Sequence, residues 1–214
     1  MSVTKAEFQQ VFGNGYTESF DAPGYVELKS MMPKLIAAHA DPEGVALDVG
    51  AGSCWLTEEW LVPHFKTVIA LDTIHQPQKP SRNGPLHPKI QFMECGDQDY
   101  SCPAISDGSI AFAHSLGCFC HLPNSANLAY LSSIYRVLKP GRKAILVFAN
   151  WPNHVGLKQH AESGRTRNRE TAGPGLWFYN DIETVAQITA QTGFKTFTDL
   201  MPGFRDLVAL FSKE

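Results

Sequence analysis

Three absences narrow what this protein can be: the sequence has no long apolar run, no excess of basic residues and no paired metal-ligand motif. No segment reaches the roughly 18 consecutive apolar residues of a membrane span. The first ten residues, MSVTKAEFQQ, lack the apolar stretch of a signal peptide. A formal net charge of -3 gives no basic footprint for nucleic acid. We therefore expect neither a membrane nor a nucleic acid as partner.

Cysteines are few, odd in number and scattered among expected core elements, which suits a reducing cytosol and predicts a cytoplasmic protein. They are Cys54, Cys95, Cys102, Cys118 and Cys120. Cys118, Cys120 and His121 form a C-x-C-H pattern, but a zinc site also needs a partner Cys/His pair elsewhere, which the sequence lacks. We see no carboxylate set for a catalytic metal at the end of the fourth expected strand. We assign no metal.

The composition is that of an ordinary globular domain. The chain has 214 residues, of which 43% are hydrophobic and 18% charged, enough for one substantial core. There is no internal repeat and no sign of a second core. We therefore expect a single domain over residues 1–214.

Residues 46–57, ALDVGAGSCWLT, have the pattern of a ligand-binding turn. The apolar run around Asp48 predicts a buried parallel strand, and Gly50 and Gly52 predict a tight turn where a Cβ would block close approach of a ligand. A helix expected over Ser53–Leu61 would then present free N–H groups and its positive dipole end to that ligand. The stretch therefore predicts a ligand cradle at the tip of the first strand.

Two further expected strands end in acidic residues. The run TVIAL, residues 67–71, ends at Asp72, about 20 residues after the glycines, where an acidic side chain can bind ribose hydroxyls. The run IQFME, residues 90–94, is followed by Asp97. Three consecutive strand ends thus carry Asp48, Asp72 and Asp97.

This spaced set of motifs resembles the class I S-adenosylmethionine-dependent methyltransferases over residues 46–213. The resemblance implies an α/β fold: a single doubly wound seven-stranded sheet, mostly parallel with an antiparallel last strand, and helices on both faces. It implies S-adenosylmethionine as cofactor and S-adenosylhomocysteine as product, with the glycine turn at the methionine part and the next two strand ends at the ribose and adenine. The cofactor-binding residues that it implies are Asp48, Gly50, Gly52, Asp72, Thr73, Asp97, Gln98, Ser115 and Leu116.

The fourth strand, expected over Ile110–His114, extends the resemblance. Its exit, the sequence SLG at 115–117, is expected to run under the cofactor. Many relatives carry an acidic residue where this strand has Ala111, a departure that leaves the methyl-transfer geometry untouched. His114 is expected to be a buried, hydrogen-bonded strand residue. His121 resembles a histidine that many small-molecule methyltransferases carry, either as a packing residue or facing the substrate.

The remaining elements follow from periodicity and helix breakers. An amphipathic helix is expected over Asn124–Leu138, stopped by KPG before a strand over Lys143–Asn150. A later helix is expected to begin at Asn180, with Glu183 as capping-box partner and Gly193 at its C′ position. The other expected elements are a helix over Val26–His39 that Pro33 should kink or split, and strands over Thr196–Leu200 and Leu207–Phe211.

Two segments are expected to face the methyl acceptor. Residues 1–40 would form a helical lid in this family, with Tyr16 and Tyr25 as substrate-binding candidates. Residues 149–179 form a long connection at the sheet edge where substrates bind, with Trp151 and His154 at the strand tip. Packing of the N-terminal helix is the alternative role for the aromatic residues. Arginines 165, 167 and 169 either recognise an anionic acceptor or form a solvated surface.

The predicted reaction is methyl transfer to an oxygen, nitrogen or sulfur atom of a small molecule. In-line attack needs mainly positioning, and a base only where the acceptor arrives protonated. His121 is the first candidate base and His154 the second. The chain lacks the N/D-P-P-Y/F turn of amino-methylating nucleic-acid enzymes and the Pro-Cys pair of cytosine C5 enzymes, which favours a small-molecule acceptor.

Two alternatives remain open at the level of sequence. An NAD-dependent oxidoreductase would share the sheet, but Trp55 occupies the position of its third glycine and no Tyr-x-x-x-Lys pair follows the fourth strand. An accessory or regulatory protein that binds the cofactor without turnover would carry the same motifs. The sequence makes no prediction of the oligomeric state.

Overall fold

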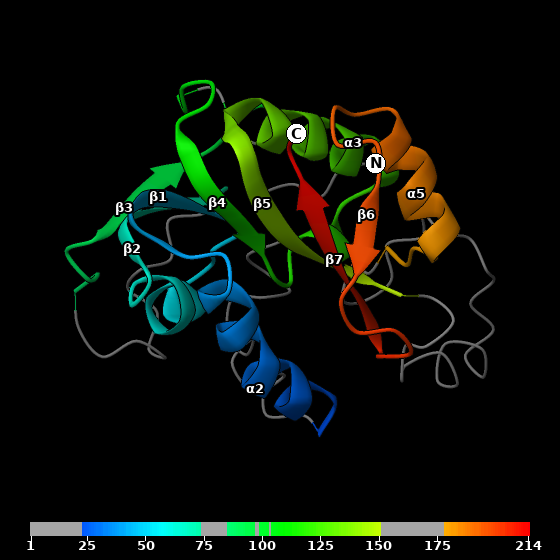
Figure 1. Cartoon of the computed structure of the whole chain (residues 1–214), viewed down its shortest axis with the longest axis horizontal. Helices are drawn as coiled ribbons and strands as arrows, with labels where there is room; N and C mark the ends of the chain where they lie inside the picture. Colours follow the sequence, from blue (N-terminus) through cyan, green and yellow to red (C-terminus); the bar gives the residue numbers. More distant parts are fainter. Residues whose placement is uncertain (1–22, 74–84, 97–98, 103, 151–177) are drawn as a thin grey trace.

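The computed structural model describes residues 23–73, 85–96, 99–102, 104–150 and 178–214, which Figure 1 draws as a coloured ribbon. Most of the expected lid, 1–40, and of the expected substrate-side loop, 149–179, lies outside these residues. Within them, none of the helices is both long and apolar enough to span a bilayer.

The described strands form one seven-stranded sheet in the order β3-β2-β1-β4-β5-β7-β6. The pairings β1–β2, β2–β3, β1–β4 and β4–β5 are parallel, whereas β7 runs antiparallel to both β5 and β6. The chain order reverses between β1 and β4, which makes their carboxyl ends the switch point where α/β proteins bind ligands. The strands are β1 Asp41–Val49, β2 Phe65–Asp72, β3 Ile90–Glu94, β4 Ile110–Ser115, β5 Leu138–Ala149, β6 Phe197–Asp199 and β7 Asp206–Ser212.

Helices cover both faces of the sheet, so the predicted doubly wound fold with an antiparallel last strand is confirmed (Figure 1). One face packs against α2, Pro23–Ala37, and the short helix η2, Thr57–Leu61. The other packs against α3, Asn124–Val137, and α5, Ile182–Ala190. A single 3-10 turn, η3 at Phe119–His121, follows β4.

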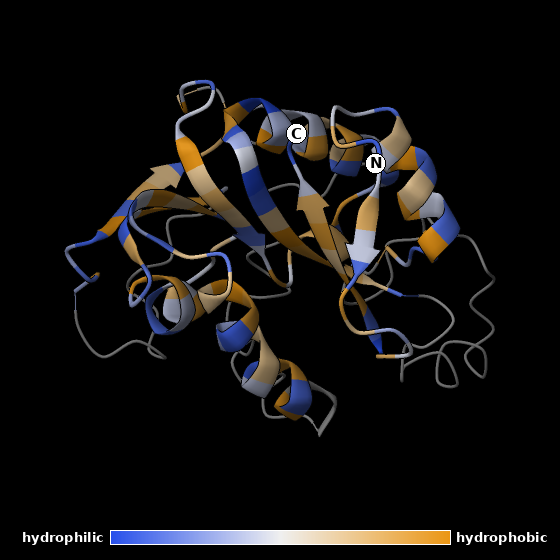
Figure 2. Cartoon of the chain, viewed as in Figure 1, coloured by the Kyte–Doolittle hydropathy of each residue, from blue (hydrophilic) through white to orange (hydrophobic). Residues whose placement is uncertain are grey.

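Each face has its own hydrophobic core, and the strands contribute buried residues to both. Figure 2 shows hydrophobic residues along much of the sheet. On α2, Leu28, Met32 and Ile36 recur every fourth residue and are fully buried. On α3, Leu131 and Ile134 are fully buried against the opposite face of the sheet. Burial of such side chains stabilises a fold by about 1.5–3 kcal/mol each.

The α2 helix is continuous through Pro33 to Ala37, so Pro33 does not split it. Two other local expectations were wrong, both at the last helix. The last helix begins one residue later than expected: its N-cap is Asp181, whose side chain accepts the Thr184 N–H at 2.7 Å, so Glu183 is not at the capping-box position. Gly193 lies beyond the Gln191 C-cap, and a Cβ there would come within 2.2 Å of the Tyr135 ring.

The strand β5 begins five residues earlier than expected, at Leu138. The KPG sequence therefore ends α3 but does not form a separate loop, because Leu138 already pairs with Ile110 of β4 and Gly141 adopts a φ of 76° within the strand.

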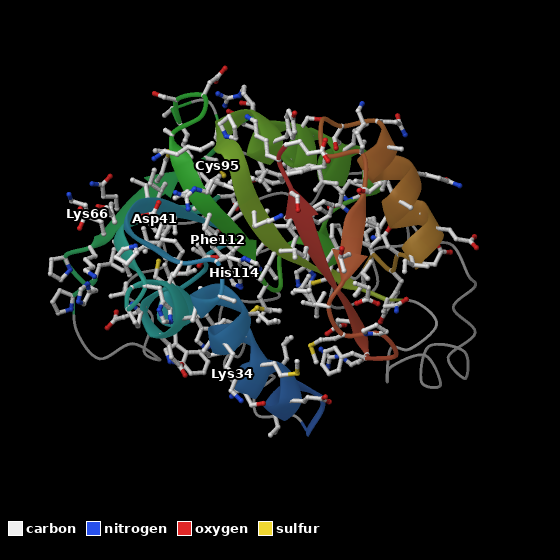
Figure 3. All side chains as sticks on the ribbon, in the orientation of Figure 1. Lys34, Asp41, Lys66, Cys95, Phe112 and His114 are labelled. Atoms are coloured by element: carbon white, nitrogen blue, oxygen red, sulfur yellow. The ribbon has the colours of Figure 1, made fainter. Side chains whose placement is uncertain are left out.

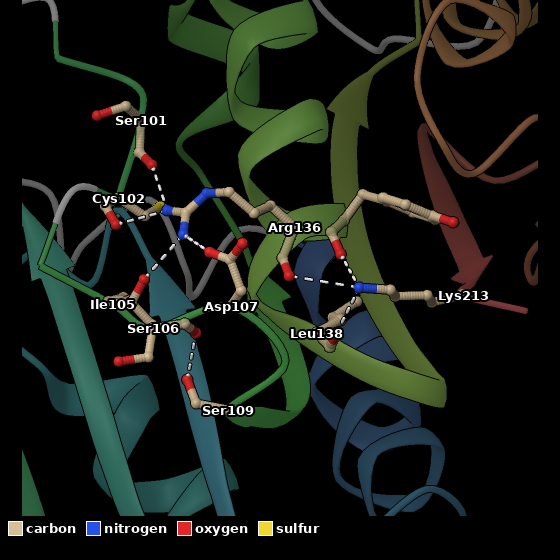
Figure 4. A network of polar contacts seen from close by, with 10 residues as sticks. Ser101, Cys102, Ile105, Ser106, Asp107, Ser109, Arg136, Leu138 and Lys213 are labelled. Carbon is tan, nitrogen blue, oxygen red and sulfur yellow. Dashed lines mark hydrogen bonds and ion pairs between the residues drawn. The ribbon is translucent and has the colours of Figure 1, made fainter.

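Two cations hold the opposite edge of the sheet, away from the carboxyl ends of the parallel strands (Figure 4). Arg136 donates to the carbonyl oxygens of Ser101, Cys102 and Ile105 at 2.9–3.0 Å and also pairs with Asp107. This fixes the connection between β3 and β4 against α3. Near the end of the chain, the Lys213 ammonium donates to the carbonyl oxygens of Tyr135 and Leu138, both at 2.7 Å. It thereby satisfies carbonyls that the end of α3 leaves without a helical partner.

We predict that Lys213→Met lowers the free energy of unfolding by about 1.5–3 kcal/mol, because it removes a charged donor from carbonyls at the end of a helix. Urea denaturation measures the loss. The control is Lys66→Met, which breaks only an exposed ion pair with Glu43 and should change stability by less than about 1 kcal/mol. Equal effects of the two substitutions would contradict the structural role of Lys213.

Candidate functional site

The glycine turn after β1 is bound to the end of β2 by three of its own N–H groups. Gly50 and Ala51 donate to the Leu71 carbonyl at 2.8 and 3.1 Å, and Gly52 donates to Oδ2 of Asp72 at 2.7 Å. Asp72, the acidic residue expected at the second strand end, therefore stabilises the turn through a hydrogen bond within the protein. The two strand ends form one unit before any ligand is considered.

Gly50 and Gly52 are required for different reasons. Both have positive φ, 74° and 54°, which side chains rarely adopt. A Cβ on Gly50 would lie 2.3 Å from the Cβ of Cys118, so the turn packs directly against the segment that leaves β4. Among the described residues, a Cβ on Gly52 would have no heavy atom within 4 Å, so the backbone there borders open space. The turn is therefore held by the end of β2 and by Cys118, and it is open beside Gly52.

The helix after the turn is shorter than expected. Cys54 has a φ of 61°, so the helical stretch begins only at Trp55 and continues as η2 to Leu61. The N–H groups of Gly50, Ala51 and Gly52 all donate to the end of β2. These three groups are therefore not the free donors that the sequence predicts for the ligand. The cradle is thus defined mainly by backbone shape. Trp55 itself lies beneath the Lys29 ammonium of α2, 5.4 Å from ring centroid to Nζ.

Asp48 lies at the centre of a buried polar network. Its carboxylate accepts the Thr57 hydroxyl at 2.6 Å on Oδ2 and faces Nδ1 of His114 at 2.9 Å on Oδ1. Asp48 is 3% exposed and Thr57 is fully buried. The contacts join β1, η2 and β4, and Thr57 was not identified from the sequence. A threonine nine residues after an aspartate carries no recognisable motif, so only the fold brings the two together.

His114 is a buried, hydrogen-bonded strand residue, as the sequence predicts. With an ionised carboxylate, which only accepts hydrogen bonds, this contact requires the ring proton to be on Nδ1. The Trp60 ring meets it edge-on at 5.9 Å between centroids, and Nε2 has no hydrogen-bond partner among the described residues. In Figure 3, His114 and Phe112 lie in the middle of the molecule, away from the charged ends of Lys34 and Lys66.

The end of β4 is tied to the end of β1. The Ser115 hydroxyl donates to the Val49 carbonyl at 2.7 Å, and Ser115 is fully buried. Leu116 follows with 8% of its surface exposed, next to the Gly117–Cys118 segment that packs on the turn. His121 ends η3 and is 4% exposed. The structure thus brings Asp48, the turn, Asp72, Ser115 and Leu116 to neighbouring strand ends.

Four of the cysteines have a raised pKa because they are buried. Burial raises the pKa of Cys95, Cys118 and Cys120 above the ordinary range. Burial also raises the pKa of Cys102 to about 12. A nucleophilic role needs a lowered pKa, which none of these four shows. Among the described residues, no group of three or more His, Cys, Asp and Glu side chains is arranged to hold a metal ion.

Sequence reasoning missed a second polar group, beside the end of β5. Phe178 donates its N–H to the Cys120 carbonyl at 2.6 Å and Asn180 donates to that of Ala149 at 2.8 Å, so residues 178–180 lie between η3 and β5. Asp206, which starts β7, pairs with Arg205; burial raises the pKa of this carboxyl, and Arg205 offsets part of that rise. The sequence contains one feature of this group, Asn180 at the end of the apolar run LWFYN, but that asparagine predicts only the start of a helix.

Several predicted site residues fall outside the described residues: Tyr16, Asp97, Gln98, Trp151 and His154. The backbone of Tyr25 lies in α2, but its side chain is not among those described. Thr73 directly follows β2, and its hydroxyl lies 3.5 Å from Oδ1 of Asp72.

Comparison with known proteins gives a consistent result. A family model described as a methyltransferase domain matches residues 27–198. No curated protein matches the sequence.

Solved structures that resemble the chain share its fold at low identity. A Burkholderia thailandensis 1,6-didemethyltoxoflavin-N1-methyltransferase, solved with 1,6-didemethyltoxoflavin and S-adenosylhomocysteine, is 19% identical with a TM-score of 0.66, covering 97% of this chain and 86% of that one. Human N-acetylserotonin methyltransferase with S-adenosylmethionine is 13% identical with a TM-score of 0.63, covering 97% and 55%. A methyltransferase from Methanosarcina mazei is 16% identical with a TM-score of 0.57, covering 84% and 98%.

We predict that Thr57→Val lowers the free energy of unfolding by about 1.5–3 kcal/mol, because it removes the hydroxyl donor from a buried carboxylate without changing the size of the side chain. Thr189→Val is the matched control: this threonine is equally buried, but its hydroxyl donates to the neutral Val185 carbonyl, so about 0.5–1.5 kcal/mol is expected. Denaturant titration compares the two. A smaller loss for Thr57→Val than for the control would show that the Asp48 network is not a main support of the site.

Proposed function

The chain belongs to the methyltransferase domain family, and on that premise we propose that it transfers a methyl group from S-adenosylmethionine to an oxygen, nitrogen or sulfur atom of a small molecule. The observation that carries the proposal is the bond from the Gly52 N–H to Asp72, which joins the first two strand ends beside open backbone. The family match also removes the oxidoreductase alternative.

The residues present fit this cofactor. The open side of Gly52 leaves room for the methionine part beside the turn, and Asp72 has an oxygen beyond the one that accepts Gly52. Asp72 with Thr73 would bind the ribose, Asp97 with Gln98 the adenine, and Ser115 with Leu116 would form the floor. Asp48 acts through the turn, because its two oxygens already contact Thr57 and His114.

The sulfonium methyl that the cofactor supplies is already activated, so this protein's own contribution is mainly orientation. The buried Asp48 network and the Leu71 carbonyl fix the turn from inside, and the Val49–Ser115 bond fixes the adjoining end of β4. Rigid placement of reacting groups is worth a large share of the barrier in well-oriented reactions.

The acceptor side is proposed to consist of Tyr16, Tyr25 and Trp151, with His121 as the first candidate base and His154 as the second. His121 is supported by its position in η3, directly after the end of β4 that adjoins the turn. A small-molecule acceptor is supported by the absence of nucleic-acid methyltransferase motifs from the sequence. All five cysteines are free thiols, which supports a place in the reducing cytoplasm.

Asp72→Ala should weaken binding of S-adenosylhomocysteine by on the order of 1–3 kcal/mol and also lower the melting temperature, because it removes both the ribose acceptor and the brace on Gly52. Asp72→Asn keeps an oxygen for Gly52 and should weaken binding with little change in melting temperature. Calorimetric titration and thermal melts separate the two roles. Unchanged affinity in both variants would rule out the ribose site.

Labelled-methyl transfer into a metabolite extract tests turnover and distinguishes an enzyme from an accessory protein that only binds the cofactor. With the acceptor that this finds, His121→Gln should lower the transfer rate about 10²- to 10⁴-fold, the usual contribution of a general base, without changing affinity for S-adenosylhomocysteine. His64→Gln, in the turn before β2, is the control. A wild-type rate in His121→Gln would leave His154→Gln as the next variant to measure.

A further inference from the structure

Two asparagines beside the end of β5 have amide atoms that the described residues leave unsatisfied. Asn180 is 1% exposed, and neither its Oδ1 nor its Nδ2 has a hydrogen-bond partner among the described residues. Asn150 pairs with Asn180 in a parallel bridge, and its Oδ1 is likewise buried with no partner in the described part of the chain. Because both atoms of the Asn180 amide are unsatisfied, either orientation of the amide leaves one donor and one acceptor in this position.

These amides adjoin the glycine turn through a short chain of contacts. Asn180 lies between β5 and η3, since Phe178 donates to Cys120 of η3 and Asn180 to Ala149 of β5. The η3 turn follows Cys118, which packs on Gly50. Cys120, Ala149 and Tyr179 form a small apolar cluster next to the amides. The asparagines are therefore on the β4–β5 side of the switch point, across from the ribose residue Asp72.

An unsatisfied buried amide is costly to the free protein, which argues for a partner that is bound during function. Leaving a buried donor or acceptor unpaired destabilises a protein by about 1–3 kcal/mol, and an apolar residue of the same shape removes that cost. Asn180 has two such atoms. Native proteins keep destabilising polar groups of this kind mainly where function needs them.

We propose that Asn180, with Asn150 beside it, binds the methyl acceptor through an amide-like edge, an N–H donor next to a carbonyl acceptor, as found in lactams and cyclic imides. The proposal rests on the proposed function, because it specifies the acceptor class of the same site. The two amide atoms of Asn180 pair with the donor and acceptor of that edge, and Oδ1 of Asn150 accepts a further N–H or O–H from the ligand.

The test uses two probes of the same ring, 2-pyridone, which has the N–H and carbonyl side by side, and N-methyl-2-pyridone, in which the donor is blocked. Saturation-transfer NMR on the whole protein, with and without saturating S-adenosylhomocysteine, should show 2-pyridone binding at least about 10-fold more tightly than its N-methyl analogue. Asn180→Leu should abolish that preference. Equal binding of the two probes to the wild-type protein would overturn the proposal.

Thermal stability gives a second readout that a merely structural role would move in the opposite direction. Asn180→Leu should raise the melting temperature by about 2–4 °C, because it replaces unsatisfied polar atoms with apolar ones. The control is Asn127→Leu on α3, where Nδ2 donates to the Leu122 carbonyl and only Oδ1 is unpaired among the described residues, so its melting temperature should not rise as that of Asn180→Leu does, and the preference for 2-pyridone should persist. A lowered melting temperature in Asn180→Leu would assign Asn180 to the fold and overturn the proposal.

Binding of S-adenosylhomocysteine keeps the two proposals separable. Asn180→Leu should bind it within about 2-fold of the wild-type protein, because the hydrogen bonds that hold the turn run to Leu71 and Asp72 and do not involve Asn180. If the wild-type protein fails to bind S-adenosylhomocysteine, the proposed function fails, and the probe experiment without S-adenosylhomocysteine still decides whether the amide site exists.

Discussion

The site depends on one buried carboxylate. The Asp48 carboxylate accepts a hydrogen bond from the Thr57 hydroxyl of η2 and lies within hydrogen-bond distance of Nδ1 of His114 on β4. A single side chain therefore joins three elements at the tip of β1. A charge in an apolar interior is tolerated only when hydrogen bonds replace its water, and both of its oxygens have such bonds here. The glycine turn begins two residues later, so this network fixes the strand end from which the turn starts.

The donors of the turn are engaged inside the protein, which changes how the cradle should be understood. Gly50, Ala51 and Gly52 donate to the end of β2, and Gly50 packs on Cys118. The turn is therefore held in one conformation without a ligand, so little ordering entropy opposes binding. In the proposed complex, recognition of the methionine part relies on shape and on the open face of Gly52 more than on free N–H groups.

The sequence predicts the sheet because strand periodicity, the acidic strand ends and the chain order are local or regularly spaced features. It fails where the deciding contact is remote in the chain. Thr57 is important because of Asp48, and Gly193 because of the Tyr135 ring, and neither relation has a sequence signature. The helix after the glycine turn begins later than expected because Cys54 has a positive φ. Asn180 was given a role in helix capping that belongs to Asp181.

The two sides of the switch point differ in how their polar groups are satisfied. On the proposed cofactor side, Asp48 bonds to Thr57 and His114 and Gly52 of the turn bonds to Asp72, so a substitution within either group disturbs its bonded partners. On the acceptor side, Asn150 and Asn180 have amide atoms without partners among the described residues. Substitutions at separate groups add nearly independently, whereas those within one network do not. If Asn150 and Asn180 bind the acceptor as proposed, substitutions at these two positions change the acceptor preference of this S-adenosylmethionine-dependent methyltransferase while the glycine turn stays intact.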